Sequence, residues 1–184
     1  MDTSPSLADL LHAWRDFYAL VGAASATLVG LLFVAASIGA SAFREEHRTP
    51  LNSFLTPTVV HFAAVLFTCI WGCVPSQSWW SFGGLLGAGW LLGLIYCASI
   101  VFRLMIQRRF KVDLSDRIFY AAIPALGYLM MLIAAALLLM QRPASVEMIA
   151  AALLTLLFAG IRNAWDMTLW TATKSPPGGE PPPV

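Results

Sequence analysis

Long apolar segments separated by short polar ones dominate the sequence. Residues 17–43 read FYALVGAASATLVGLLFVAASIGASAF, without a charged side chain. A membrane-spanning helix needs roughly 20 mostly apolar residues. Backbone groups in lipid must be satisfied by one another, and the segments lack the period-two alternation of barrel strands, so helices are predicted. The predicted spans are residues about 17–43, 54–74, 82–102, 118–140 and 146–170.

The two ends of the chain differ from these spans. Within residues 1–16, apolar side chains recur at helical spacing, which predicts a short amphipathic helix ahead of the first span. The apolar positions are Leu7, Leu10, Leu11 and Trp14. Such a helix would lie at the membrane interface, or it would dock a partner. The tail 173–184 is rich in proline and glycine, so it is expected to be flexible and extended.

Composition supports an integral membrane protein over a soluble domain with one anchor. Apolar residues make up 59% of the 184 residues and charged residues only 11%, against roughly 25% charged in soluble domains. The predicted fold class is therefore an all-α integral membrane protein, a bundle of about five transmembrane helices. The net charge of +1 gives no basic face for nucleic acid, so no nucleic-acid partner is expected.

Basic residues orient the predicted bundle, because lysine and arginine accumulate in cytoplasmic loops. Eight of them fall on the side that holds the loops 44–53 and 103–117 and the C-terminus, and two fall on the other side. The eight are Arg44, Arg48, Arg103, Arg108, Arg109, Lys111, Arg117 and Lys174, and the two are Arg15 and Arg142. The N-terminus is therefore predicted outside and the C-terminus in the cytoplasm.

Small residues four positions apart predict close helix packing in two spans. Such spacing lets helix backbones approach closely in lipid. The candidate packing positions are Gly22, Ala26 and Gly30 in the first span and Gly83, Gly87, Gly89 and Gly93 in the third. The two glycine pairs of the third span lie on different faces, so that span is expected to contact helices on two sides. Packing within one chain and packing between identical chains both remain open, and a homo-oligomer is expected.

The FYALVG and ATLVGLLFV stretches of the first span resemble the opening helix of small uncharacterised bacterial inner-membrane proteins. The resemblance covers about two dozen residues. It implies a bacterial inner membrane and carries no function.

Charge appears inside the fifth predicted span, in GIRNAWD, where charged side chains are rare and are candidates for function. Arg162 and Asp166 lie one helical turn apart and are predicted to pair, with Asn163 or His61 completing the hydrogen bonds. Other spans offer polar groups at a similar depth in the cytoplasmic half: Ser37, Tyr96, Ser99 and Tyr120. This predicted polar layer is either a structural network that clamps helix ends or a wet vestibule for ions or protons.

The loop 103–117 concentrates positive charge. Its role is to set topology, or its residues Arg108, Arg109 and Lys111 bind anionic lipid headgroups.

The sequence contains no metal-ligand constellation, no nucleophile elbow and no phosphate-binding glycine loop. No second histidine lies at the depth of His61 to make a haem site. An enzyme is therefore not expected, and no cofactor is predicted. The predicted function is a homo-oligomeric inner-membrane protein, with ion conduction along the oligomer axis as the working hypothesis. The alternative is a non-transporting membrane subunit or adaptor that docks a partner protein.

Overall fold

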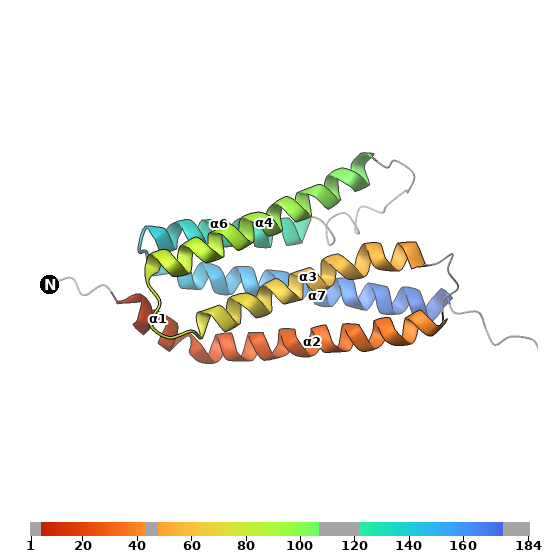
Figure 1. Ribbon diagram of the computed structural model, residues 1–184, viewed down its shortest axis with the longest axis horizontal. Coiled ribbons are helices and arrows are strands. Elements are labelled where there is room, and N and C mark those ends of the chain that lie inside the picture. Colours follow the sequence, from red (N-terminus) through yellow and green to blue (C-terminus); the bar gives the residue numbers. More distant parts are fainter. Residues whose placement is uncertain (1–4, 43–47, 107–121, 175–184) are drawn as a thin grey trace, which may run out of the picture.

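The computed structural model describes residues 5–42, 48–106 and 122–174, and the side chains of 5–37, 57–99, 122–166, 168 and 169. Within these ranges the chain forms six helices and no strand, which confirms the all-α prediction (Figure 1). The helices are α1 (Leu7–Ala13), α2 (Arg15–Ala42), α3 (Arg48–Gly72), α4 (Trp79–Ile106), α6 (Ile123–Leu139) and α7 (Ala144–Lys174).

Three of these helices are long and apolar enough to cross a membrane, so the chain is a membrane protein with transmembrane helices. The three segments are Arg15–Ser37 in α2, Trp79–Ser99 in α4 and Ala144–Asp166 in α7. Two shorter apolar segments, Pro57–Gly72 in α3 and Ile123–Leu139 in α6, accompany them. Each of the five predicted spans therefore coincides with a helix over its described part.

The five long helices run side by side, with α1 at the end of the bundle where α2 begins (Figure 1). Helix α7 packs against α6, α3 and α2. Of the residues in the apolar segment of α7, 56% are buried inside the protein, against 22% of those in the segment of α2. Helix α4 packs on α6, and α3 packs on α2. Consecutive helices α3 and α4 touch each other little. The two helices diverge, and a space lies between them.

Close approaches between helices occur at some of the predicted glycines. A Cβ atom added at Gly22 would lie 3.0 Å from the Cβ atom of Cys69 in α3. On α4, a Cβ atom would lie 3.0 Å from Leu138 at Gly83 and 3.4 Å from Ala135 at Gly87. The α2–α3 and α4–α6 contacts therefore use small residues, as expected for helices that associate in lipid.

Other members of that predicted set are exposed and have no close neighbour shown among the described residues. Ala26 is exposed, and a Cβ atom added at Gly30 or Gly89 would meet nothing within 4 Å. The stripe Gly22, Ala26 and Gly30 is thus divided, because only its first member faces α3. At Gly93, a Cβ atom would lie 2.3 Å from the ring of Tyr128 in α6. The glycines of α4 that have a close neighbour all face α6, and Gly89 faces the space beside α3.

Helix α1 is held at its start by a capping box. The Ser6 hydroxyl accepts a hydrogen bond from the Asp9 backbone amide at 3.2 Å, and the Ser6 amide donates to the Asp9 carboxylate at 3.2 Å. Hydrogen bonding by the Ser6 hydroxyl lowers the pKa of Asp9. Leu7 and Leu11 are buried against the bundle. The predicted amphipathic helix is therefore present and covers the end of the bundle with its apolar face.

Several helices extend beyond the predicted spans. Helix α3 begins at Arg48 instead of residue 54, and α4 continues to Ile106. Helix formation does not stop at the membrane border, because polar residues also form helices in water. Three sequence predictions fall outside the described residues: Tyr120 in the polar layer, Arg108, Arg109 and Lys111 as headgroup ligands, and the tail from residue 175 onward.

Candidate functional site

Six polar side chains are buried within the described part of the bundle. They are Ser25, Thr58, His61, Thr68, Ser145 and Asn163. The Ser25 hydroxyl donates to the backbone carbonyl of Phe62 at 2.7 Å and so ties α2 to α3. The Thr68 hydroxyl donates to the carbonyl of Ala64 in its own helix at 2.9 Å. These two hydroxyls therefore have structural partners.

His61 is hydrogen-bonded to a tyrosine that the sequence did not single out. Its Nδ1 atom lies 2.8 Å from the hydroxyl oxygen of Tyr128, and both side chains are 1% exposed. The ring of Tyr128 lies directly over Gly93 of α4 and 5.4 Å, centroid to centroid, from the ring of Trp90. Three helices thus position the pair: α3 contributes the imidazole, α6 the phenol, and α4 the surface under the phenol ring.

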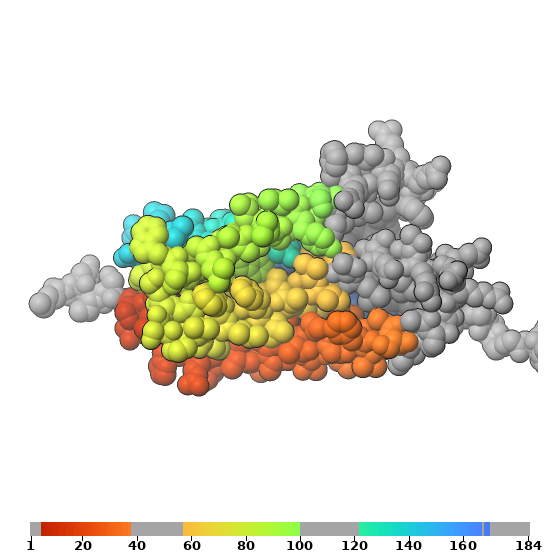
Figure 2. Space-filling view, viewed as in Figure 1, coloured from red at the N-terminus to blue at the C-terminus, as the bar shows by residue number. Residues whose placement is uncertain are grey.

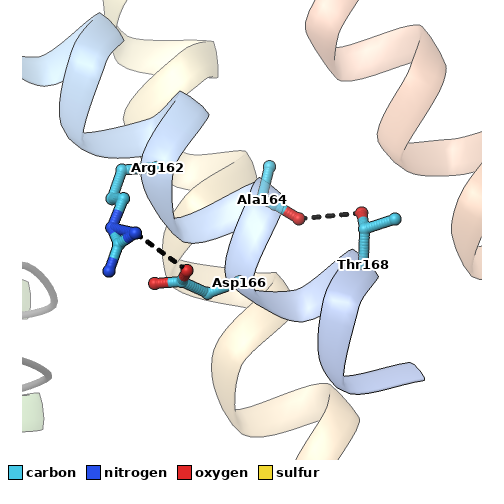
Figure 3. Close-up of polar contacts among 4 residues, drawn as sticks. All are labelled: Arg162, Ala164, Asp166 and Thr168. Atoms are coloured by element: carbon cyan, nitrogen blue, oxygen red, sulfur yellow. Dashed lines mark hydrogen bonds and ion pairs between the residues drawn. The ribbon is translucent and has the colours of Figure 1, made fainter. Parts of the chain in front are cut away.

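The predicted ion pair in α7 is present. Nη1 of Arg162 lies 3.2 Å from Oδ1 of Asp166, one helical turn away. Figure 3 shows the two side chains projecting from one side of α7, while Thr168 projects from the other and donates to the carbonyl of Ala164. The side chains of Arg162 and Asp166 are 43% and 24% exposed. The Arg162 side chain is therefore exposed on the protomer, and the Asp166 side chain is half-buried.

Asn163 has a different environment from the ion pair that flanks it. It is 1% exposed and lies three residues after Gly160, so by helical spacing the two residues share a side of α7. One turn earlier on that side, Gly160 receives the ring of Phe62, because a Cβ atom there would lie 2.5 Å from it. Thr58, one turn before Phe62 in α3, is also buried. The inner part of the α3–α7 contact thus has polar residues on both helices.

Two of the remaining described candidates of the polar layer, Ser37 and Ser99, donate hydrogen bonds within their own helices. The Ser37 hydroxyl is exposed and donates to the carbonyl of Phe33 at 2.8 Å. The Ser99 hydroxyl donates to the carbonyl of Tyr96 at 2.7 Å. Tyr96 is half-buried at the edge of the space between α3 and α4. The candidates therefore divide between an interior His61–Tyr128 pair, a partly exposed ion pair and locally satisfied hydroxyls.

A cavity of about 340 Å³ lies between α3 and α4. In the space-filling view, teal atoms of α6 are visible between the green atoms of α4 and the orange atoms of α3 (Figure 2). The residues that line it are Val60, Ala64, Phe67, Thr68, Leu86, Gly89, Trp90, Leu92, Gly93, Tyr96 and Tyr128. We call this cavity the α3–α4 groove. None of the described residues that line it is charged.

Within the described residues, no group of three or more histidine, cysteine, aspartate or glutamate side chains could hold a metal ion. Cys69 and Cys97 are buried and Cys73 is exposed, all three as free thiols.

Comparisons with known proteins add no relative to these observations. No family model matches the chain, and no curated protein or solved structure matches it either. The protein is therefore defined by its class, a helical membrane protein with transmembrane helices.

Proposed function

We propose that the protein is a five-span integral protein of a bacterial inner membrane, with its N-terminus outside and its C-terminus in the cytoplasm. The part of α3 from residue 54 to Gly72 has 19 residues, or about 28 Å at 1.5 Å per residue, which is close to a hydrocarbon core of about 30 Å. Helix α6 is shorter, but it packs between two helices of spanning length, α4 and α7. The excess of lysine and arginine in one set of loops supports the orientation.

The protein associates with copies of itself through α2. On one face of this helix the residues are small and exposed: Ala19, Ala23, Ala26 and Gly30. Close packing at small residues is the main way in which helices associate in lipid. This open face of α2 is the observation that carries the proposal. It also gives a role to Ala26 and Gly30, which are exposed on the protomer.

A path for ions in such an assembly would run between protomers and not through the interior of one protomer. The protomer interior is filled by large apolar side chains such as Phe62, Met131 and Leu153, each at most 1% exposed. The Arg162–Asp166 pair supports a wet or protein-covered surface on the cytoplasmic half. If the membrane-spanning part of α7 begins at Met148, just after the exposed Glu147, a span of roughly 20 residues ends at about residue 167. Arg162 then lies about 8 Å inside the edge of the hydrocarbon core. Charged groups facing lipid at that depth are unfavourable, so water or a neighbouring protomer is expected beside them.

The subunit number tests the proposal. Native mass spectrometry of the purified protein is expected to show a closed homo-oligomer. Gly30→Leu should lower the subunit number while leaving the thermal stability of the protomer unchanged, because no atom lies within 4 Å of a Cβ atom there. Gly84→Leu on α4, which has equally open surroundings, is the matched control and should keep the oligomer. A monomeric wild-type protein would overturn self-association. If an oligomer is found, ion flux in liposomes tests whether it conducts ions.

A second candidate function uses the same open face of α2. A membrane subunit or adaptor would place a helix of another protein on Ala23, Ala26 and Gly30. This candidate predicts a monomer that purifies with a second protein in fixed proportion, and loss of that protein in Gly30→Leu.

A further inference from the structure

The α3–α4 groove follows from how the glycines of α4 are distributed. Gly83 and Gly87 pack against Leu138 and Ala135 of α6, and Gly93 receives the ring of Tyr128. These contacts draw α4 onto α6, whereas α3 packs on α2 and α7. The two consecutive helices therefore diverge, and Gly89, which carries no side chain to fill the gap, faces the opening.

The chemistry of the groove is apolar. Three of its lining residues carry hydroxyls, and two of these are already hydrogen-bonded to protein: Thr68 to the carbonyl of Ala64 and Tyr128 to His61. The third, Tyr96, is half-buried. The rest of the lining is aliphatic, aromatic or glycine. A ligand here would gain dispersion contacts along its length and few new hydrogen bonds.

The volume of the groove limits its occupant. A helix with its side chains is about 10–12 Å wide, so two turns occupy on the order of 1,000 Å³. The groove offers about 340 Å³, so a helix of a second copy could insert only some of its side chains, whereas a single extended hydrocarbon chain can lie within it. It also lies beside Trp79–Ser99, a segment of membrane-spanning length, so lipid is the medium into which it opens.

We propose that the α3–α4 groove binds one acyl chain of a membrane phospholipid. The chain lies over Gly89, between Phe67 of α3 and Leu92 of α4, with Tyr128 and Trp90 beneath it. Bound in this way, it fills the gap that the divergence of α3 and α4 leaves, and it restores atom contacts to their facing surfaces. The inference rests on the membrane location in the proposed function but not on self-association through α2.

Photolabelling tests the site directly. The full chain is placed in phosphatidylglycerol and phosphatidylethanolamine vesicles that contain a phosphatidylcholine with a diazirine in one acyl chain. After illumination, adducts are mapped by mass spectrometry. Adducts are expected on Leu86 and Tyr128, which are 2% and 1% exposed and which an acyl chain reaches through the groove. Leu20 and Phe158 are 72% and 65% exposed elsewhere, and they report general contact with lipid.

A matched pair of variants sharpens the result. Gly89→Leu places a side chain in the groove, where a Cβ atom would meet no described atom within 4 Å. Gly84→Leu adds the same side chain at an equally open position of α4 that does not line the groove. Gly89→Leu should reduce labelling of Leu86 and Tyr128 by about tenfold, or about 1.4 kcal/mol, which is the loss of roughly ten atom contacts. Gly84→Leu should leave that labelling unchanged.

Two outcomes overturn the acyl-chain site, and the first needs no variant. Labelling of Leu20 and Phe158 without labelling of Leu86 or Tyr128 in the wild-type protein would show a membrane protein whose groove is closed to lipid. Equal groove labelling in Gly89→Leu and Gly84→Leu would show that the adducts do not arise in the groove. Absence of every adduct, including those on Leu20 and Phe158, would instead contradict the membrane location on which both proposals rest.

Discussion

The Nδ1 atom of His61 lies 2.8 Å from the hydroxyl oxygen of Tyr128, and this hydrogen bond joins α3 to α6 inside the bundle. Both groups are almost fully buried, at 1% exposure. A buried polar group without a hydrogen-bond partner is strongly unfavourable, and here each side chain supplies the partner that the other needs. Because Tyr128 also lies over Gly93, the bond positions the phenol ring that lines the α3–α4 groove.

Removing the Tyr128 hydroxyl should destabilise the protein. We expect Tyr128→Phe to lower the free energy of unfolding in detergent by about 1–3 kcal/mol, because the His61 ring nitrogen loses its partner in a buried site. Tyr96→Phe is the control, since Tyr96 is half-buried and lines the same groove. If both variants lose the same stability, the hydrogen bond contributes nothing measurable.

The Arg162–Asp166 pair should show coupling in a double-mutant cycle. Asp166→Asn and Arg162→Gln each remove one charge of the pair and leave the other on the helix, so each should lower stability. The double variant should recover part of the loss, with a coupling of about 0.5 kcal/mol for an i,i+4 pair bordered by water and more where lipid surrounds it. Denaturation of all four proteins in one detergent measures it.

Additive losses across that cycle would mean that the two charges act independently. The same four proteins separate the two interpretations of the pair. Ion flux in liposomes that follows stability across the variants supports a clamp. A well-folded double variant with changed ion selectivity supports a wet pathway.

Gly93 is expected to tolerate no side chain. A Cβ atom there would lie 2.3 Å from Cε1 of Tyr128, so Gly93→Ala must displace a buried ring that is also hydrogen-bonded to His61. We expect a loss of about 1–3 kcal/mol, as for other overpacked sites. Gly84→Ala in the same helix meets nothing within 4 Å and should stabilise it by roughly 0.5–1 kcal/mol. Thermal unfolding of both variants gives the comparison, and similar melting temperatures would contradict the close contact.

The proposed orientation can be measured by cysteine labelling in intact cells, with the three native cysteines replaced by alanine. A cysteine at Ser78, in the turn between α3 and α4, should react with a membrane-impermeant reagent from outside. A cysteine at Ser115, which lies outside the described residues, should react only after the membrane is opened. The basis is the excess of basic residues in the loops 44–53 and 103–117. The reverse pattern would invert the bundle and place the Arg162–Asp166 pair in the outer half.

The polar candidates illustrate where sequence reasoning succeeded and where it stopped. The Arg162–Asp166 pair could be predicted because both partners lie on one helix, at a spacing that helical geometry makes adjacent. The partner of His61 could not, because Tyr128 is 67 residues away on another helix. A histidine within a span indicates that a polar partner, such as a hydroxyl on another span, lies nearby. Because several spans offer hydroxyls at similar depth, the sequence does not identify which of them is the partner.

The small residues show the same division. Spacing identified Gly22, Gly83 and Gly87 as packing positions, and each has a close neighbour. The same spacing selected Gly30 and Gly89, which have none among the residues that the structure describes. Gly127, which receives Leu156, belongs to no such pair, and Gly160, which receives Phe62, begins the pair Gly160–Ala164 that was not singled out from the sequence. Spacing reports where a close approach is sterically permitted, but whether a partner occupies that face depends on the arrangement of the other helices.

The amino-acid sequence by itself determined the class of the protein, the number and approximate position of its long helices, and the ion pair within α7. These properties depend on local composition and on the 3.6-residue period of a helix. Only the tertiary structure decided which helices touch, that α3 and α4 diverge, and that His61 meets Tyr128. In a chain whose spans are almost uniformly apolar, hydrophobicity does not distinguish one helix face from another, so shape complementarity and a few buried hydrogen bonds select the arrangement.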